Sequence, residues 1–445
     1  MEDGSMPMIT AGIIAEYNPF HRGHQYHIEE TRRQTGADYI LVIMSGDYVQ
    51  RGEPAVTDKY LRTRLALMGG ADLVVELPVI YASASAEYFA AAGVKLLHQL
   101  RCVDYLSFGS EKAGVEDFEP FVKILSEEPP FYRRQLRVAL KTGKNFPLAR
   151  EEALKECAGR EYQEEGLLWD IVRKPNHILG LEYLKALRRL DSSIVPVTVR
   201  RQGAGYHDEN IRQPFPSASA IRSTLRRGGS EQEGPDTFAD AAEERQVSAN
   251  MARKDSLSAA MGEEIAGTFL SAWQAGETVS WEELLPFLSY AVTMEEESPD
   301  DFFGFDRDMA ARFQKMYRPG LSFSELTKSM HTKRLTDAAI RRAFLHRVLH
   351  IKKEEYLRQA AEAPVPYARV LGFARRAAPL LKRMREQATI PVLQRPAEGK
   401  RFPEGSPAAG MFAADIRAAQ LYEQIAAGRS GRKPVSEWTR QQIIV

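Results

Sequence analysis

Short apolar runs of strand length alternate with longer helical stretches through the first half of the chain. Four such runs, at residues 9–14, 39–44, 73–77 and 103–108, each lead into a turn that contains glycine or proline. Strands that alternate with helices in this way predict a parallel sheet with helices on both faces. Ligands of such sheets bind beyond the carboxyl ends of the strands, so a site is expected in the turns that follow these runs.

The length of 445 residues exceeds what one ordinary core organises, so two domains are expected. A further strand at 194–200 and a helix at 218–227 would complete a first α/β domain over residues 8–228. Residues 229–264 are rich in Gly, Ser, Glu and Ala, which predicts a linker or a weakly packed segment. Residues 265–445 are helical in composition and predict a mainly helical, basic second domain.

Overall composition excludes several classes of protein. Lys plus Arg and Asp plus Glu number 60 each, so net charge gives no indication of a nucleic-acid partner. Cys102 and Cys157 lack the CxxC spacing, which argues against a disulfide framework or a structural zinc site. No apolar run approaches the roughly 20 residues that cross a bilayer, and the first residues do not resemble a signal peptide. We therefore expect a cytoplasmic protein with no membrane association.

The segment from 16 to 24, EYNPFHRGH, carries most of the chemical information. It places His21 and His24 three residues apart at the start of a predicted helix, where backbone amides and the helix dipole favour phosphate. Each imidazole can donate a hydrogen bond to a phosphoryl oxygen, and Gly23 leaves room for close approach. Two histidines at this spacing also occur as packing residues or metal pairs. The preceding strand and the Asn-Pro turn favour the nucleotide interpretation.

This segment is similar to the HxGH signature of the nucleotidylyltransferase superfamily, which includes the class I aminoacyl-tRNA synthetases. The longer string from Gly12 to His27 resembles one family within it, the bacterial tRNA(Met) cytidine acetate ligases. The resemblance implies a Rossmann-like nucleotidylyltransferase fold for the first domain. It continues in order through residues 44–54, 72–78, 107–111, 174–180 and 203–207, with further matches at 366–373 and 415–418.

The resemblance implies ATP contacts along the first turn and at Gly109, Asn176 and Arg201. A glycine after a strand suits close approach to a nucleoside, an amide both donates and accepts, and a guanidinium stabilises phosphate. Taken alone, a turn glycine, a helix cap and a surface arginine would explain these three. The implied residues of the first turn are Ile14, Ala15, Glu16, Tyr17, Asn18, Pro19, Phe20, His21, Gly23, His24 and His27.

A second signature of the superfamily is a Ser/Thr-rich segment that ends in a basic residue, and residues 217–222, SASAIR, are similar to it. Ser217 and Ser219 at a helix start could bind the β- and γ-phosphates, and Arg222 would add charge. Alone, this string is equally typical of a helix cap. Arg51 and Lys59 each follow a strand and are either ligands of a phosphate or carboxylate, or ordinary exposed cations.

A local surplus of positive charge lies in the predicted second domain. Residues 307–395 contain 20 Lys and Arg against 7 Asp and Glu. The spacing of Lys333, Arg334, Arg341 and Arg342 leaves several cations on one side of a helix, which suits an RNA backbone. The alternative is a solvated helix face. The resemblance to a tRNA-modifying family favours RNA.

The resemblance implies an ATP-dependent ligase. It would activate acetate as acetyl-adenylate and transfer the acetyl group to the wobble cytidine of elongator tRNA(Met), forming N4-acetylcytidine. His21 and His24 are the predicted catalytic residues, because in-line phosphoryl chemistry requires mainly positioning and charge stabilisation. Mg²⁺ would accompany ATP, although no carboxylate cluster identifies a dedicated metal site.

Two alternatives remain open at the level of the residues. One is an adenylyltransferase that acts on a mononucleotide or a phosphopantetheine-like substrate, which would not need a basic helical domain. The other is a non-catalytic RNA-binding regulatory protein with a degenerate nucleotide fold, against which the intact His21, Gly23 and His24 argue. The residues do not identify the acid, the oligomeric state or the bases that are contacted.

Overall fold

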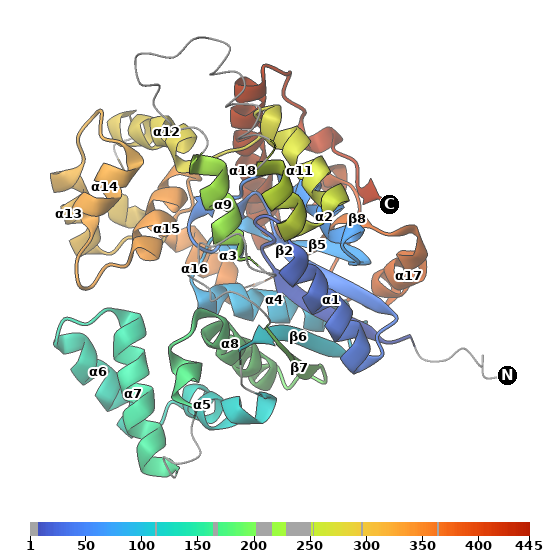
Figure 1. Cartoon of the computed structure of the whole chain (residues 1–445). Coiled ribbons are helices and arrows are strands. Elements are labelled where there is room, and N and C mark those ends of the chain that lie inside the picture. The colour runs from blue at the N-terminus through green and yellow to red at the C-terminus, as the bar shows by residue number, and fades with distance from the viewer. Residues whose placement is uncertain are drawn as a thin grey trace.

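The computed structural model describes residues 8–111, 114–162, 168–201, 216–227, 251, 253–294, 297–362 and 365–445. Within these residues a mostly parallel sheet lies at the centre, and helices cover both of its faces (Figure 1). This is the predicted Rossmann-like α/β class, followed by a mainly helical C-terminal part. The parallel sheet follows from the alternation of strands and helices in the sequence.

The sheet of the described residues has the strand order β10-β8-β5-β2-β1-β6-β7, and β9 also pairs with β8. Neighbouring strands are parallel except β5 and β8. The order runs one way from β1 through β2 to β5 and the other way through β6 to β7. This switch point forms a crevice at the carboxyl ends of β1 and β6, where ligands of such sheets bind. The strands are β1 (Thr10–Ala15), β2 (Tyr39–Ser45), β5 (Leu73–Leu77), β6 (Tyr105–Ser110), β7 (Val195–Arg200), β8 (Ala368–Phe373), β9 (Val392–Leu393) and β10 (Ile443–Ile444).

Alternate residues of the sheet enter two different cores. Leu41 and Ile43 of β2 face one core, whereas Ile40, Val42 and Met44 face the other. Because both faces are covered, these strands read as continuous apolar runs in the sequence. Helices of the first core include α3 (Val79–Ala82), α4 (Ala86–Leu100), α5 (Val115–Glu127), α6 (Pro130–Lys141), α7 (Phe146–Glu161) and α8 (Pro175–Arg189), and helices of the second are α1 (Arg22–Thr35), α2 (Lys59–Met68), α9 (Ala218–Arg227) and α11 (Glu263–Gln274).

The C-terminal part adds helices and also strands. Its β8, β9 and β10 join the sheet of the N-terminal part, so the sheet includes residues from both sides of the predicted domain boundary. The division at 228 and 265 stays a prediction, because most of the predicted linker lies outside the described residues. The helices are α12 (Trp281–Met294), α13 (Arg307–Met316), α14 (Phe323–Met330), α15 (Asp337–Val348), α16 (Lys353–Glu362), α17 (Ala378–Gln387) and α18 (Pro407–Ser430).

A buried ionic network ties the C-terminal segment to the sheet. The ammonium of Lys59 lies 2.8 Å from Glu76 on β5 and 2.7 Å from Glu437, and Arg369 on β8 contacts both carboxylates at 3.1 and 2.6 Å. Their side chains are at most 5% exposed. Although burial opposes it, Lys59 and Arg369 lower the pKa of Glu437 to about 2. Lys59 is therefore a structural ion rather than a ligand of the crevice.

Replacing Lys59 by methionine is expected to destabilise the fold strongly. Two buried carboxylates would lose a cation, and breaking a buried pair in this way costs about 3–5 kcal/mol. Thermal unfolding followed by circular dichroism measures the effect. Lys382→Met on α17 is the control, because that side chain is 78% exposed and 4.0 Å from its partner. Equal shifts in both variants would contradict the structural role of Lys59.

Candidate active site

Two histidines cap the first turn of α1, just beyond the carboxyl end of β1. His21 is the N-cap residue, and its Nδ1 accepts a hydrogen bond from the backbone amide of Gly23 at 3.1 Å. The backbone amide of His21 donates in return to Nδ1 of His24 at 3.3 Å. The two rings stack with centroids 3.7 Å apart. This reciprocal cap, more commonly made by Ser or Thr with Glu or Gln, fixes both imidazoles at the helix N-terminus.

Both histidines are neutral donors. Because each Nδ1 accepts an amide hydrogen, the neutral ring carries its proton on Nε2. Burial lowers the pKa of His21 to about 3, with a smaller contribution from Arg201 and Arg222. Burial also holds the pKa of His24 well below its usual range, reinforced by His21. The turn therefore offers Nε2 hydrogens without ring charge, and positive charge comes from the two arginines and the helix dipole.

Gly23 provides space for the imidazole of His21. A Cβ at this position would lie 2.9 Å from Cε1 and 3.0 Å from Nδ1 of that ring. Any side chain here would therefore displace His21 from its capping position. The sequence predicted that Gly23 makes room for a nucleotide. The structure shows that it also makes room for the ring of His21.

Arg62 on α2 holds the turn between β1 and α1 in place, and its side chain is completely buried. Its Nη1 donates to the carbonyl oxygens of Glu16 at 2.7 Å and Ser45 at 3.0 Å, Nη2 donates to that of Gly46, and Nε donates to that of Thr57 at 3.1 Å. One guanidinium thus joins the segments that follow β1 and β2. Sequence reasoning missed this positioning residue, because an arginine in a helix ordinarily lies at the surface.

A cavity of about 220 Å³ opens beside the histidines. Seven segments that are separate in the sequence converge on it, from the end of β1 to α9. The predicted ATP-binding residues that line it are Ile14, Ala15, Glu16, Tyr17, Asn18, His21, Gly23, His24, His27, Gly109, Asn176, Arg201, Ser217, Ser219 and Arg222.

Two predicted residues of the turn do not line this cavity. Pro19 follows a cis peptide bond, and Phe20 is fully buried with its ring against Gly69 and 5.0 Å from the ring of Tyr17. They shape the turn rather than contact a ligand in the cavity. The matching segment at 203–207 lies outside the described residues.

The second predicted segment forms both a helix cap and a cavity wall. The hydroxyl of Ser217 accepts a hydrogen bond from the amide of Ala220 at 3.0 Å. Arg222 reaches back to the first turn, where its Nη1 donates to the carbonyl oxygen of Asn18 at 2.7 Å, and its Nη2 contacts Ser219 at 3.3 Å. The two interpretations of this segment are therefore compatible.

Another part of the cavity wall comes from β6, from the start of α8 and from the residue after β7. The side chain of Arg201 crosses Gly109, where a Cβ would lie 3.2 Å from its Cγ. Asn176 at the start of α8 donates to Glu111 at 3.2 Å, and His27 contacts Ser107 at 2.9 Å. These contacts hold polar groups at the crevice, as the switch point of the sheet predicts.

Other lining residues were missed by sequence reasoning or left open. Arg51, an open candidate, lies on the cavity wall, whereas Lys59 does not. Apolar side chains add a surface suited to a nucleoside. They read as ordinary core residues in the sequence, and only the fold shows that they border a cavity: Phe89, Phe108, Leu179, Tyr183 and Val199.

The predicted basic helix is α15, and its cations do not share one environment. Lys333 and Arg334, in the loop before it, are exposed. Arg341 instead contacts Glu53 at 3.2 Å, and Arg342 donates to a carbonyl oxygen of the hairpin formed by β3 (Tyr48–Val49) and β4 (Glu53–Pro54). Burial lowers the pKa of Arg342 to about 10. Arg347, one to two turns further along α15, is 2% exposed.

The sheet order and the His-x-Gly-His turn at its switch point define a class of protein. A sequence model described as HIGH Nucleotidyl Transferase matches residues 8–435, so the chain is a nucleotidyl transferase of that class.

More specific relatives span nearly the whole chain. The tRNA(Met) cytidine acetate ligase of Acetivibrio thermocellus is 34% identical over 87% of this chain and 88% of its own length. That of Caldanaerobacter subterraneus subsp. tengcongensis is 35% identical over 93% and 95%. The crystal structure of Thermotoga maritima TmcAL bound with alpha-thio ATP superposes with a TM-score of 0.84 at 28% identity, covering 98% of this chain and all of that one. The chain belongs to the family of tRNA(Met) cytidine acetate ligases.

Two further features of the described residues concern membrane crossing and metal binding. No helix among them has both the length and the apolar character that a bilayer crossing requires. Nor do they contain a group of three or more His, Cys, Asp or Glu side chains arranged to hold a metal ion.

Substituting alanine for Gly23 is expected to weaken ATP binding roughly tenfold, the effect of losing about one hydrogen bond to phosphate. The added methyl group displaces the His21 ring and with it the Nε2 donor. Calorimetric titration with ATP measures the affinity. Gly428→Ala is the matched control, since a Cβ there has no described atom within 4 Å. Unchanged affinity in the Gly23 variant would contradict the assignment of His21.

Proposed function

We propose that this chain uses ATP to activate acetate as acetyl-adenylate and then acetylates the wobble cytidine of elongator tRNA(Met). The single observation that carries the proposal is the pair of neutral, reciprocally capped histidines at the switch point of the sheet. Membership of the family supports the substrates, which the residues alone do not identify.

The first step requires stabilisation of charge rather than a base. An acetate oxygen attacks the α-phosphorus, and the bond to the leaving pyrophosphate breaks with its electron pair on oxygen. Acetate is already an anion near neutral pH, so no proton has to be removed. We assign the Nε2 hydrogens of His21 and His24 to the oxygens on which negative charge develops.

The remaining lining residues fit the rest of the nucleotide. Ser217, Ser219, Arg201 and Arg222 would hold the β- and γ-phosphates, since hydroxyls, helix-start amides and guanidinium groups bind such oxygens. The apolar wall beside Gly109 would take the nucleoside. Mg²⁺ would enter with ATP on the phosphate oxygens, as it commonly does when a protein supplies few carboxylates.

The second step transfers the acetyl group. The N4 nitrogen of cytidine attacks the acetyl carbon, the bond from that carbon to the phosphate oxygen breaks, and AMP leaves with the electron pair. The nitrogen gives up one proton to water and keeps the other, which yields the amide of N4-acetylcytidine.

Acetate is expected to drive pyrophosphate release from ATP, and unmodified elongator tRNA(Met) to gain a cytidine that is heavier by one acetyl group. Pyrophosphate release with and without acetate, followed by mass analysis of the tRNA nucleosides, measures both steps. Release that ignores acetate would favour another adenylyl-transfer substrate, such as a mononucleotide. Absence of release together with tRNA binding would favour a non-catalytic RNA-binding protein.

His24→Ala is expected to reduce acetate-dependent ATP–pyrophosphate exchange by roughly 100-fold, the usual effect of removing one prepositioned donor. Its affinity for tRNA should stay within about twofold. Reversing charge at Lys333 and Arg334 should instead lower tRNA affinity by roughly tenfold and flatten its salt dependence, because phosphate contacts release counterions.

The control for the charge reversal is Lys382→Glu with Arg385→Glu, which makes the same change on exposed positions of α17. This pair should retain both exchange and tRNA affinity. If either test variant lost both activities together, the proposed separation between an adenylation site and an RNA-binding loop would be wrong.

A further inference from the structure

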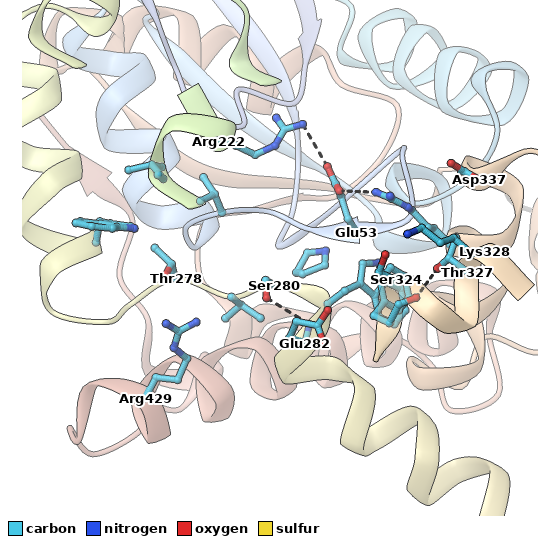
Figure 2. Close-up of a pocket in the computed structure, with 18 of the residues that line it drawn as sticks. Glu53, Arg222, Thr278, Ser280, Glu282, Ser324, Thr327, Lys328, Asp337 and Arg429 are labelled. Atoms are coloured by element: carbon cyan, nitrogen blue, oxygen red, sulfur yellow. Dashed lines mark hydrogen bonds and ion pairs between the residues drawn. The ribbon is translucent and has the colours of Figure 1, made fainter. Parts of the chain in front are cut away.

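A second cavity, of about 820 Å³, lies beside the first, between the β3–β4 hairpin and the C-terminal helices (Figure 2). Its walls come from β4, α9, the loop between α11 and α12, and from α14, α15 and α18. Residues of both parts of the chain thus enclose it. It is larger than the cavity beside the histidines, and neither His21 nor His24 lines it.

One arginine side chain borders both cavities. Arg222 lines both of them. Its Nη1 donates to the carbonyl oxygen of Asn18 in the histidine turn, and its Nη2 lies 3.4 Å from Oε1 of Glu53 on the side of the second cavity (Figure 2). A group bound in the second cavity and a nucleotide bound in the first would therefore both border this side chain.

Glu53 presents a buried acceptor to the second cavity. The residue is 7% exposed, and its Oε2 contacts Arg341 at 3.2 Å. Its Oε1 forms the 3.4 Å ion pair with Arg222, and among the described residues no group donates a hydrogen bond of normal geometry to it. A carboxylate oxygen can accept more than one hydrogen bond, so this buried oxygen is suited to a ligand that brings an N–H or O–H group.

The other walls add flat and cationic surfaces. The ring of Trp281 stacks on Phe323 with centroids 4.3 Å apart, and its Nε1 donates to the carbonyl oxygen of Gly52 at 2.7 Å, so the ring is rigidly held. Arg341 and Lys328 contribute donors to the same cavity. A cavity with aromatic side chains, a carboxylate and cations has the features that proteins use to hold an unstacked base.

These features match the base edge of cytosine. Its amino group donates, and a carboxylate is the usual side chain that accepts from it, whereas N3 and O2 accept from cations. Uracil carries an oxygen in place of the amino group and would place an acceptor against Glu53. Acetate has no flat face and would leave most of 820 Å³ unfilled.

We propose, on the basis of the proposed function, that the second cavity receives the acceptor cytidine of the tRNA, turned out of its stack. Glu53 accepts a hydrogen bond from the N4 amino group and so selects cytidine over uridine. The predicted RNA-binding loop leads directly into this cavity, because His331 lines it and Lys333 and Arg334 follow two and three residues later. Enzymes that modify a base commonly extrude it in this way.

Filling the cavity tests the proposal without altering the adenylation residues. Ser324 is exposed at the cavity wall on α14, so Ser324→Trp should reduce acetyl transfer to tRNA by at least roughly 100-fold. Acetate-dependent ATP–pyrophosphate exchange should stay within about twofold of the unaltered protein. Ser271→Trp, at an exposed serine of α11 that lines neither cavity, is the matched control and should leave both rates unchanged.

Binding of anticodon stem-loops gives a readout that does not depend on catalysis. The unaltered protein and the Ser271 variant should prefer a stem-loop with cytidine at the wobble position over one with uridine by roughly tenfold or more, and Ser324→Trp should abolish that preference. A Ser324 variant that transfers acetyl normally, or that keeps the preference, would overturn the proposal. Absence of acetate-dependent exchange in the unaltered protein would contradict the proposed function. The stem-loop preference would still show whether the second cavity binds cytidine.

Discussion

The candidate active site depends on the burial of one positive charge. Arg62 lies at the carboxyl ends of β1 and β2, where backbone carbonyl groups point beyond the sheet and need donors. Its guanidinium supplies them from a single rigid plane, which an ammonium does not do. Burying a charge is favourable only when it is well compensated, and four carbonyl oxygens provide that compensation here. The backbone at the start of the histidine turn is therefore held in one position.

Burial also determines the protonation state of the two histidines in the turn that Arg62 holds. Burial keeps His21 and His24 neutral, so they donate hydrogen bonds without repelling the nearby Arg201 and Arg222. Protonated rings stacked 3.7 Å apart would repel each other and both arginines. A reaction whose nucleophile is a carboxylate needs no general base, so neutral histidines are compatible with the proposed first step. Positive charge is concentrated instead at the arginines, where the phosphates would lie.

A feature could be predicted from the sequence when residues close to it in the chain determine it. Features that depend on contacts between distant parts of the chain could not. The strands at 39–44 and 73–77 and the position of His21 and His24 at a helix start depend on neighbouring residues, so apolar runs and spacing were sufficient to predict them. The strand at 368–373 pairs with β5 across almost 300 residues, and no local pattern indicates that partner. Arg341 and Arg342 were predicted to bind RNA from one side of a helix, and only the fold shows that both contact the β3–β4 hairpin.

Around Glu53, where the two cavities adjoin, positive side chains outnumber negative ones. Arg222 and Arg341 both contact the carboxylate of Glu53, so two guanidinium groups share one negative charge. The surplus positive charge lies where Arg222 faces the histidine turn. The side chains of Arg222 and Glu53 are only 13% and 9% exposed, so their interactions are less screened than at the surface, and the phosphate of an adenylate is favoured beside Arg222. The carboxylate favours an amino group on the other side, so each partner of the acyl transfer would have a site of matching charge beside the same arginine.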